Sequence, residues 1–308
     1  MKFGIAFKLG CLLAVFGVLA CGLTGYYSYS SSRATLLKAA ERDLLTATQV
    51  LGRNLRGNID GVSRDALMLA GIAQGKALPQ LSSTLAREHA ENDLAELFRT
   101  LIRVHPEYMQ IRLISAAGHG LEQVRVDRDG EQPLRITNAG LQEKGHFDYV
   151  FDTLRLPSGK VRLSQVVINH ELGTHSGVGR PTLHVSTPVV GDDGQPSSLI
   201  VINIDLNQLF NQLRSDLPAY YQVYLGNRWG DLLIHPDQSR TFGFDQGRRH
   251  FLQTEFPDVQ RLLGAEAESL IGRSDGEKAG LVAAFVRLAT NPGNVENFVV
   301  LGLAQPEE

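Results

Sequence analysis

The sequence has little cysteine, no excess of basic charge and no long run of charge of one sign. Both cysteines, Cys11 and Cys21, lie in an apolar N-terminal stretch, so the rest of the chain has no thiol with which to form a disulfide. The formal net charge is −3, which gives no basic field that would indicate nucleic-acid binding. A fold without disulfides is compatible with an oxidising compartment and does not require one.

The short motifs of common catalytic sites are also missing. We find no Gly-x-Ser-x-Gly elbow, no Walker loop and no Gly-rich dinucleotide fingerprint, so we expect neither an enzyme nor a bound cofactor. His170, Glu171 and His175 share one loop and are possible metal ligands, but their spacing matches no strong zinc pattern and we predict no metal site. Asp192 and Asp193 are expected to be turn residues rather than calcium ligands.

The N-terminal stretch is typical of a membrane helix. No charged residue lies between Lys8 and Arg33, and this run would extend roughly 36 Å at about 1.5 Å per residue, enough to cross a bilayer core. Lys2 and Lys8 precede the run, so the positive-inside rule places the N-terminus in the cytoplasm and the bulk of the chain outside the bacterial inner membrane. Two alternatives remain: a cleaved signal peptide, and a lipoprotein signal ending at Cys21.

A helical pattern with leucine or another apolar residue every three or four positions runs from Arg33 to about Leu69. Leu37, Leu44 and Leu51 lie on a seven-residue repeat, which favours a partner helix and therefore a homodimer. The alternative is a helix that packs along its own domain. A second helix is expected from about Leu85 to Ile102, ended by His105-Pro106.

The clearest sheet signal is the stretch from Pro181 to Leu206. Apolar and polar residues alternate after Pro181, a Gly-Asp-Asp-Gly turn follows, and Leu199 to Ile204 is almost continuously apolar. We expect a hairpin followed directly by a helix from Leu206 to Leu213, which Asn207 can start. Earlier strands are predicted at Tyr108 to Ile114, Leu121 to Asp127 and Val161 to Asn169, with a short helix between the second and third, which is a PAS-like order.

A shorter version of the same pattern follows, with two strands, a helix from about Asp258 to Leu263 and two final strands. The fold class is therefore α+β, with an N-terminal transmembrane helix, a long stalk helix and two PAS-like antiparallel sheets. The expected segments are 1–8 (cytoplasmic), 9–30 (transmembrane), 31–75 (stalk and dimerisation helix), 76–215 (membrane-distal ligand-binding domain) and 216–305 (membrane-proximal domain).

This arrangement resembles the extracytoplasmic double Cache sensor domain of bacterial transmembrane receptors, over roughly Arg33 to Gln305. The segments that carry the resemblance are YMQIRLISAAGHGLEQVRVDRDG, RLSQVVIN, RPTLHVSTPVV, GQPSSLIVINIDL and GNRWGDLLIHPDQSRTFGFDQG. It is greatest to the sensors of histidine kinases and of proteins that make or degrade cyclic di-GMP. In that family a second transmembrane helix and a cytoplasmic output module follow, so we expect the sensory part of a longer receptor, or a gene that lost its output.

The resemblance also implies where a small-molecule ligand binds, between the distal sheet and the helix that covers it. By position, the candidate residues are Arg112, Arg125 and Asp127 on the first hairpin, Tyr149 on the covering helix, Ser164 on the third strand, and His184, Ser186 and Asn203 on the last two strands. Asn203 occupies the position of an aspartate that meets the ligand's amine in amino-acid-binding members, which weakens the case for an amino acid.

Arginines with hydroxyls favour a carboxylate, such as that of an organic acid, or a phosphate, because a guanidinium donates paired hydrogen bonds. The alternative for Arg125 and Asp127 is an ion pair that only holds the strand. The alternative for the whole chain is a ligandless periplasmic module or lipoprotein that binds a partner protein.

Overall fold

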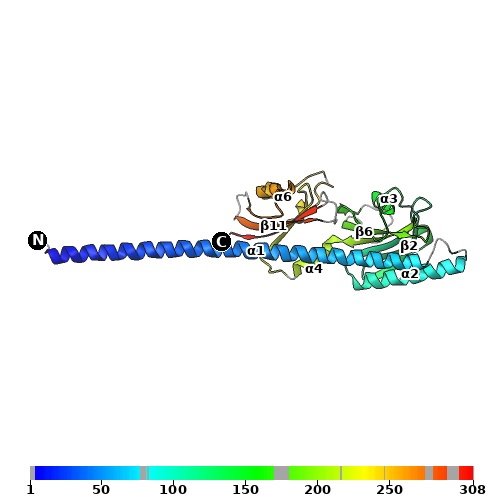
Figure 1. The fold of residues 1–308 in the computed structure, drawn as a ribbon, viewed down its shortest axis with the longest axis horizontal. Helices are drawn as coiled ribbons and strands as arrows, with labels where there is room; N and C mark the ends of the chain where they lie inside the picture. Colours follow the sequence, from blue (N-terminus) through cyan, green and yellow to red (C-terminus); the bar gives the residue numbers. More distant parts are fainter. Residues whose placement is uncertain are drawn as a thin grey trace.

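The computed structural model describes residues 4–76, 81, 83–169, 180–215, 217–245, 247–274, 280–289 and 298–307, and nothing is said of the structure of the others. Its helices are α1 (Ile5–Lys76), α2 (Thr84–Val104), α3 (Asp148–Leu154), α4 (Leu206–Ser215), α5 (Leu252–Glu255) and α6 (Gln260–Leu263). Two antiparallel sheets lie side by side along α1, as Figure 1 shows. This is the α+β arrangement that the sequence predicts.

Helix α1 runs without a break for 72 residues, about 108 Å at 1.5 Å per residue. One helix in the described part of the chain is long and apolar enough to cross a membrane, and it is this one. Every described side chain from Gly4 to Ala40 is exposed, and burial begins at Glu41. A protein that starts at Arg33 therefore keeps every described contact of the folded core.

The predicted dimer seam on α1 is wrong at two of its three leucines. Leu44 and Leu51 are 0% and 4% exposed because they pack inside this chain, and only Leu37 remains 39% exposed. Thr48, on the same face, donates to the carbonyl of Ala284 at 3.4 Å. The heptad spacing thus serves a contact with the chain's own sheet, which was the alternative interpretation of the pattern.

The distal sheet contains seven strands: β1 (Tyr108–Ser115), β2 (Glu122–Asp129), β3 (Gln132–Ile136), β4 (Arg162–Leu163), β5 (Val167–Ile168), β6 (Pro181–Val190) and β7 (Pro196–Asp205). Their order is β3-β2-β1-β7-β6-β4, and β5 also pairs with β6. The hairpins β1–β2 and β6–β7 match the expectation. The sequence pattern did not predict β3, which is only five residues long and is exposed or partly exposed at all positions but the last.

The predicted strand from Val161 to Asn169 is two short strands, β4 and β5, with Ser164 between them. The Ser164 hydroxyl, rather than a backbone carbonyl, accepts the hydrogen bond from the backbone N–H of His184 at 2.9 Å. A side chain thus takes the place of one rung of the ladder, which interrupts the strand. Helix α4 starts at Leu206, as expected, and the Asp205 carboxylate accepts a capping hydrogen bond from the backbone N–H of Asn207 at 2.9 Å.

The proximal sheet contains five strands: β8 (Gln222–Gly226), β9 (Leu232–Ile234), β10 (Ser269–Arg273), β11 (Leu281–Ala289) and β12 (Phe298–Pro306). Their order is β10-β11-β12-β8-β9. The sequence analysis missed β10. The predicted helix from Asp258 to Leu263 is a 3-10 turn, Pro257–Val259, followed by α6.

Each sheet is covered on both faces. Helix α1 lies on one face of both sheets, joined by α2 over β1 to β3, and α3 and α6 lie on the opposite faces (Figure 1). One apolar cluster runs along the α1 side from Leu44 through Leu94 and Ile202 to Leu303. This continuous core holds the two sheets and the long helix together.

Candidate functional site

The face of the distal sheet turned away from α1 carries polar side chains on four neighbouring strands. They come from alternate positions, because successive side chains of a strand point to opposite faces. The register places Arg112 opposite Arg125, Gln110 opposite Asp127, and His184 opposite Asn203. The described residues of this polar face are Gln110, Arg112, Arg125, Asp127, His184, Ser186 and Asn203, each 6% exposed or less.

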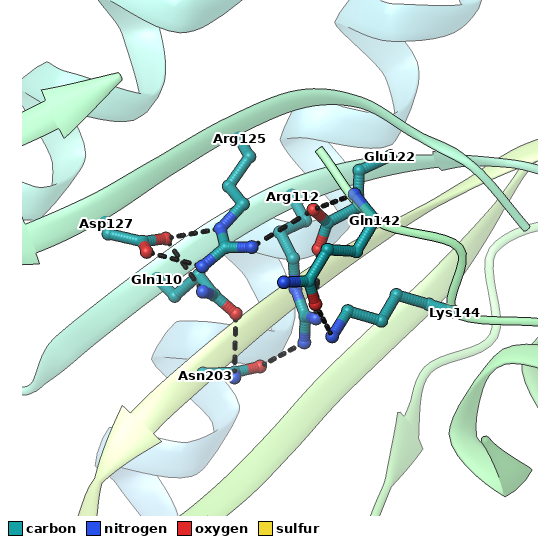
Figure 2. Close-up of polar contacts among 8 residues, drawn as sticks. All are labelled: Gln110, Arg112, Glu122, Arg125, Asp127, Gln142, Lys144 and Asn203. Atoms are coloured by element: carbon teal, nitrogen blue, oxygen red, sulfur yellow. Dashed lines mark hydrogen bonds and ion pairs between the residues drawn. The ribbon is translucent and has the colours of Figure 1, made fainter. Parts of the chain in front are cut away.

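Five of these side chains, together with Glu122, form a closed ring of hydrogen bonds, shown in Figure 2. Arg112 donates to Glu122 (3.4 Å) and Asn203 (3.0 Å), and Asn203 donates to Gln110 (3.1 Å). Gln110 donates to Asp127 at 2.7 Å. Arg125 donates to Asp127 through Nε at 2.9 Å and Nη2 at 2.7 Å, and to Glu122 at 3.2 Å, which closes the ring.

Glu122, Gln142 and Lys144 also belong to this site, and the sequence analysis did not find them. The backbone N–H of Gln142 donates to Glu122 at 3.1 Å, and the Lys144 ammonium donates to the side-chain oxygen of Gln142 at 2.8 Å. Glu122 has the same parity as Val124, so strict alternation places it on the α1 side. A bulge in β2 at Gln123, opposite Leu113 and Ile114 of β1, brings it to the polar face instead.

Positive charge exceeds negative charge among the eight residues drawn in Figure 2. Arg112, Arg125 and Lys144 are cations, whereas Glu122 and Asp127 are the carboxylates. Burial lowers the pKa of the Arg125 guanidinium, but the hydrogen bonds and charge of Asp127, with the charge of Glu122, outweigh burial and raise this pKa above its ordinary value. The arginine is therefore charged at every physiological pH.

Asn203 is the junction of the ring and uses both ends of its amide. Its oxygen accepts from Arg112, and its nitrogen donates to the side-chain oxygen of Gln110. An aspartate at this position would have no donor for Gln110, whose own amide nitrogen is already directed at Asp127. The amide at this position is thus required by its neighbours, and it brings no negative charge to the site.

Helix α3 covers this polar face with an aromatic side chain. The ring of Tyr149 stacks on His184 with centroids 4.7 Å apart and planes 8° apart, and the Arg112 guanidinium lies 5.3 Å from the Tyr149 centroid. The hydroxyls of Thr153 and Ser186 are 2.7 Å apart. Seven of the eight predicted residues are therefore brought together, by the sheet and by α3.

The eighth, Ser164, lies apart from them, between β4 and β5, where it lines a cavity between the two sheets. The loop with His170, Glu171 and His175 lies outside the described residues. Within the described part of the chain, no three His, Cys, Asp or Glu residues are grouped so as to hold a metal ion. Asp193 accepts from the N–H of Gln195 at 2.9 Å, which confirms it as a turn residue.

The model of the family described as the bacterial histidine kinase sensor domain matches residues 72–271. This chain belongs to that family. No curated protein sequence matches it at a significant level. With its two sheets on one long helix, the sensor has the double Cache fold that its sequence resembles.

Solved structures of the same fold come from several kinds of receptor. The extracellular domain of the histidine kinase vpHK1S-Z8 superposes with a TM-score of 0.69 at 16% identity, over 88% of this chain and 96% of that one. A domain of a sensory box/GGDEF family protein from Vibrio parahaemolyticus gives 0.69 at 17% identity, over 88% and 97%. The ligand-binding domain of the Pseudomonas fluorescens chemoreceptor CtaA, solved with L-alanine, gives 0.55 at 15% identity, over 87% and 98%.

Proposed function

We propose that this sensor domain binds a small anionic molecule, an organic acid or a phosphate, on the polar face of its distal sheet beneath α3. The observation that carries the proposal is the surplus of positive charge in the buried cluster of Figure 2. An anion is attracted to a group in which cations exceed carboxylates, and a guanidinium can donate paired hydrogen bonds to a carboxylate or phosphate. The place of contact is where Arg112, Tyr149 and His184 meet.

The residues predicted from the sequence divide into two roles under this proposal. Arg112, Tyr149, His184, Ser186 and Asn203 lie toward α3, where they would touch the ligand. The ion pair of Arg125 and Asp127 would instead hold its strand, which is the alternative stated for these two residues, and would position Arg112 through the ring of hydrogen bonds. Ser164, which lies elsewhere, would contact no ligand bound at this face.

An amino acid is a weaker candidate for this chain than for CtaA. An ammonium group needs a carboxylate, and Asn203 offers only the oxygen of an amide that Arg112 already occupies. A carboxylate or phosphate has no such requirement and matches a guanidinium, which donates paired hydrogen bonds.

Binding would also shift the conformation of the sensor. The side chains of the polar face are nearly all buried, so α3 must move away from the sheet for a ligand to enter. A ligand that favours one position of α3 shifts the equilibrium between the two arrangements.

We propose that the apolar part of α1 anchors the chain in the inner membrane and that the bulk of the chain is periplasmic. A homodimer would then pass the conformational shift to a cytoplasmic histidine kinase or cyclic di-GMP enzyme.

The test is a thermal-shift screen of the soluble sensor, Arg33 to Glu307, against organic acids, phosphates, amines, polyamines and amino acids. A ligand at a hundredfold excess over its dissociation constant stabilises the folded state by about 2.7 kcal/mol. We expect a hit among the acids or phosphates that disappears in Arg112→Gln. Arg103→Gln, an exposed arginine on α2, is the matched control and should leave the hit unchanged.

A hit among amines alone would contradict the anionic assignment. No hit in any class would favour the second candidate function, a ligandless module that binds a partner protein. The closed ring itself favours that alternative, because each carboxylate in it has hydrogen-bond donors within the chain. The next experiment would then be a search for the partner with the same soluble sensor.

A further inference from the structure

A cavity of about 320 Å³ lies between the two sheets, separate from the polar face of the distal sheet. The wall of this interdomain cavity is mostly apolar and comes from three parts of the chain: Leu55 and Ile59 on α1, Leu183 and Phe210 on the distal side, and Leu233 on the proximal side. An apolar cavity of about 150 Å³ already binds benzene, and small-molecule pockets have volumes of about 300–1,000 Å³. The interdomain cavity is therefore large enough for a compact organic molecule.

The charged side chains at the cavity are engaged within the chain. Arg249 donates to both oxygens of Asp231, at 2.7 and 2.8 Å, and the side-chain nitrogen of Asn227 donates to Asp231 at 3.0 Å. The Arg228 guanidinium lies over the ring of Trp229, 4.0 Å from the centroid, and makes a further interaction within the chain. A charged ligand would therefore find no counter-charge available to it among the described lining residues.

Two polar side chains of the wall are also satisfied within the chain. The Ser164 hydroxyl donates to the carbonyl of Gln165 at 2.7 Å and accepts from the backbone N–H of His184 at 2.9 Å. The amide oxygen of Asn227 accepts from two backbone N–H groups of its own turn, at 2.9 and 3.0 Å. What the cavity offers a ligand is thus contact with apolar groups rather than with unsatisfied polar ones.

We propose that the interdomain cavity binds an uncharged, mostly apolar small molecule, with its body between α1 and the two sheets and one edge beside Trp229. The apolar wall supplies the affinity, because removal of apolar surface from water is the main driving force in such a site. A charged group on the ligand lowers the affinity whatever its sign, because it loses water without gaining a counter-charge.

The position of this cavity gives its occupant a contact with both sheets and with α1 at once. Val167 and Leu183 belong to strands of the distal sheet, whereas Leu225 and Val299 belong to strands of the proximal sheet. A ligand that fits one relative position of the sheets better than another would favour that position. This site is independent of the anionic site proposed on the distal face, and either can exist without the other.

The chain carries its own reporter of this cavity, because Trp229 is its single tryptophan and is 54% exposed at the mouth. The soluble sensor, Arg33 to Glu307, is titrated with adamantan-1-ol, adamantane-1-carboxylate and 1-adamantylamine, three probes with the same compact body and different head groups. We expect the alcohol to move the Trp229 emission to shorter wavelength in a saturable way, because it removes water from the ring, and to raise the melting temperature. The carboxylate and the amine should each bind at least tenfold more weakly than the alcohol.

Three phenylalanine substitutions decide whether the response comes from the cavity. Gln165→Phe and Val167→Phe each place a ring at the mouth and should weaken binding of adamantan-1-ol at least fivefold, whereas Leu134→Phe, on β3, should leave it unchanged. Val167 and Leu134 are 39% and 38% exposed and Gln165 is exposed, so none of these changes puts a new side chain into a packed core. The distal variant Arg112→Gln should also leave the Trp229 response unchanged.

Three results would overturn the assignment: no saturable change in emission or melting temperature with adamantan-1-ol, binding of either charged probe as tight as that of the alcohol, or unchanged affinity in both mouth variants. Loss of binding in Leu134→Phe as large as in the mouth variants would overturn it as well, since the response would then follow general stability. Circular dichroism of each variant establishes that it is folded before the titration is interpreted.

Discussion

Asp127 makes the paired contact with the buried Arg125, which also donates to Glu122 at 3.2 Å. Its two oxygens accept two parallel hydrogen bonds from Arg125, and all these side chains are 0% exposed. Removing one partner of a buried ion pair leaves an uncompensated charge in a medium of low dielectric constant, which typically costs 3–5 kcal/mol. The ring therefore depends on this carboxylate.

We predict that Asp127→Ala lowers the free energy of unfolding by about 3–5 kcal/mol, measured by urea denaturation. Asp129→Ala is the control, because Asp129 lies on the same strand and is exposed. The control should change the free energy of unfolding by less than about 0.5 kcal/mol. A cost for Asp127→Ala as small as that of the control would show that water reaches Arg125.

Glu255, on α5, makes the free energy of unfolding depend on pH in the acidic range. It accepts from His235 at 3.1 Å and pairs with Arg240. Burial raises the pKa of the Glu255 carboxyl, but hydrogen bonds and charge from His235 and Arg240 outweigh burial, so this pKa lies below its ordinary value of 4.5. A lowered pKa in the folded state means that the stabilisation is present above about pH 4.5 and is lost as pH falls through the folded pKa.

Glu255→Gln should therefore be less stable than the wild type at neutral pH, with a difference that narrows as pH falls below about 4.5. Thermal melts of both proteins between pH 3 and 7 measure this convergence. Glu131→Gln, at an exposed turn, should show the same small difference at every pH. A wild-type advantage that persists unchanged at pH 3 would contradict the lowered pKa.

At the scale of single elements, Gly52 and Gly57 of α1 have different surroundings although both interrupt the same apolar pattern. A Cβ on Gly52 would lie 3.0 Å from a methyl carbon of Leu288 on β11, whereas a Cβ on Gly57 meets no atom within 4 Å. Glycine at 52 thus permits the close approach of helix and sheet, and glycine at 57 only weakens the helix.

We predict that Gly57→Ala raises the free energy of unfolding by about 0.5–1 kcal/mol, the usual gain in an exposed helix interior. Gly52→Leu should lower it by about 1–3 kcal/mol, because the added side chain overpacks the contact with β11. Urea denaturation measures both. A loss of stability in Gly57→Ala would indicate that another surface covers this part of α1, for example a second copy of the chain.

The elements were predictable where apolar periodicity was strong. The alternation in Tyr108 to Ile114 and the apolar run of Leu199 to Ile204 gave β1 and β7, and their shared polar face followed from parity. Short, partly exposed strands such as β3 and β10 have no such signal, because their stability comes from pairing with a neighbour rather than from burial.

Candidate site residues could be predicted where the alternation of side chains along a strand decides which face they occupy. The closed ring of hydrogen bonds could not be predicted. Glu122 reaches the ring through a register shift, and Lys144 reaches it from a loop that no periodicity describes. The prediction of a dimer contact at Leu44 and Leu51 was wrong for a related reason. A heptad spacing identifies the buried face of a helix, but it does not say whether a sheet or a second helix covers that face.

At the scale of the whole molecule, one apolar cluster joins α1 to both sheets, so we predict that the two sheets unfold together. Trp229 fluorescence reports the junction of the sheets, and far-UV circular dichroism reports all the helices and strands. The two urea transitions of the soluble sensor should have the same midpoint and slope. Separate midpoints would mean that the core around α1 divides into two independent units.

Arg273 on β10 links α1 to the residue that follows β12. Its guanidinium donates to Glu41 of α1 and to Glu307 after β12, each at 2.8 Å, so it ties the incoming helix to the outgoing strand. Along α1, the positions one turn away from Glu41, about 5.4 Å up or down the axis, are Leu37 and Leu45. Neither leucine can replace the carboxylate. If α1 slides by one turn against the final strand, the hydrogen bond from Arg273 to Glu41 is lost and no carboxylate takes its place, so this arginine distinguishes a single axial alignment of α1 and β12.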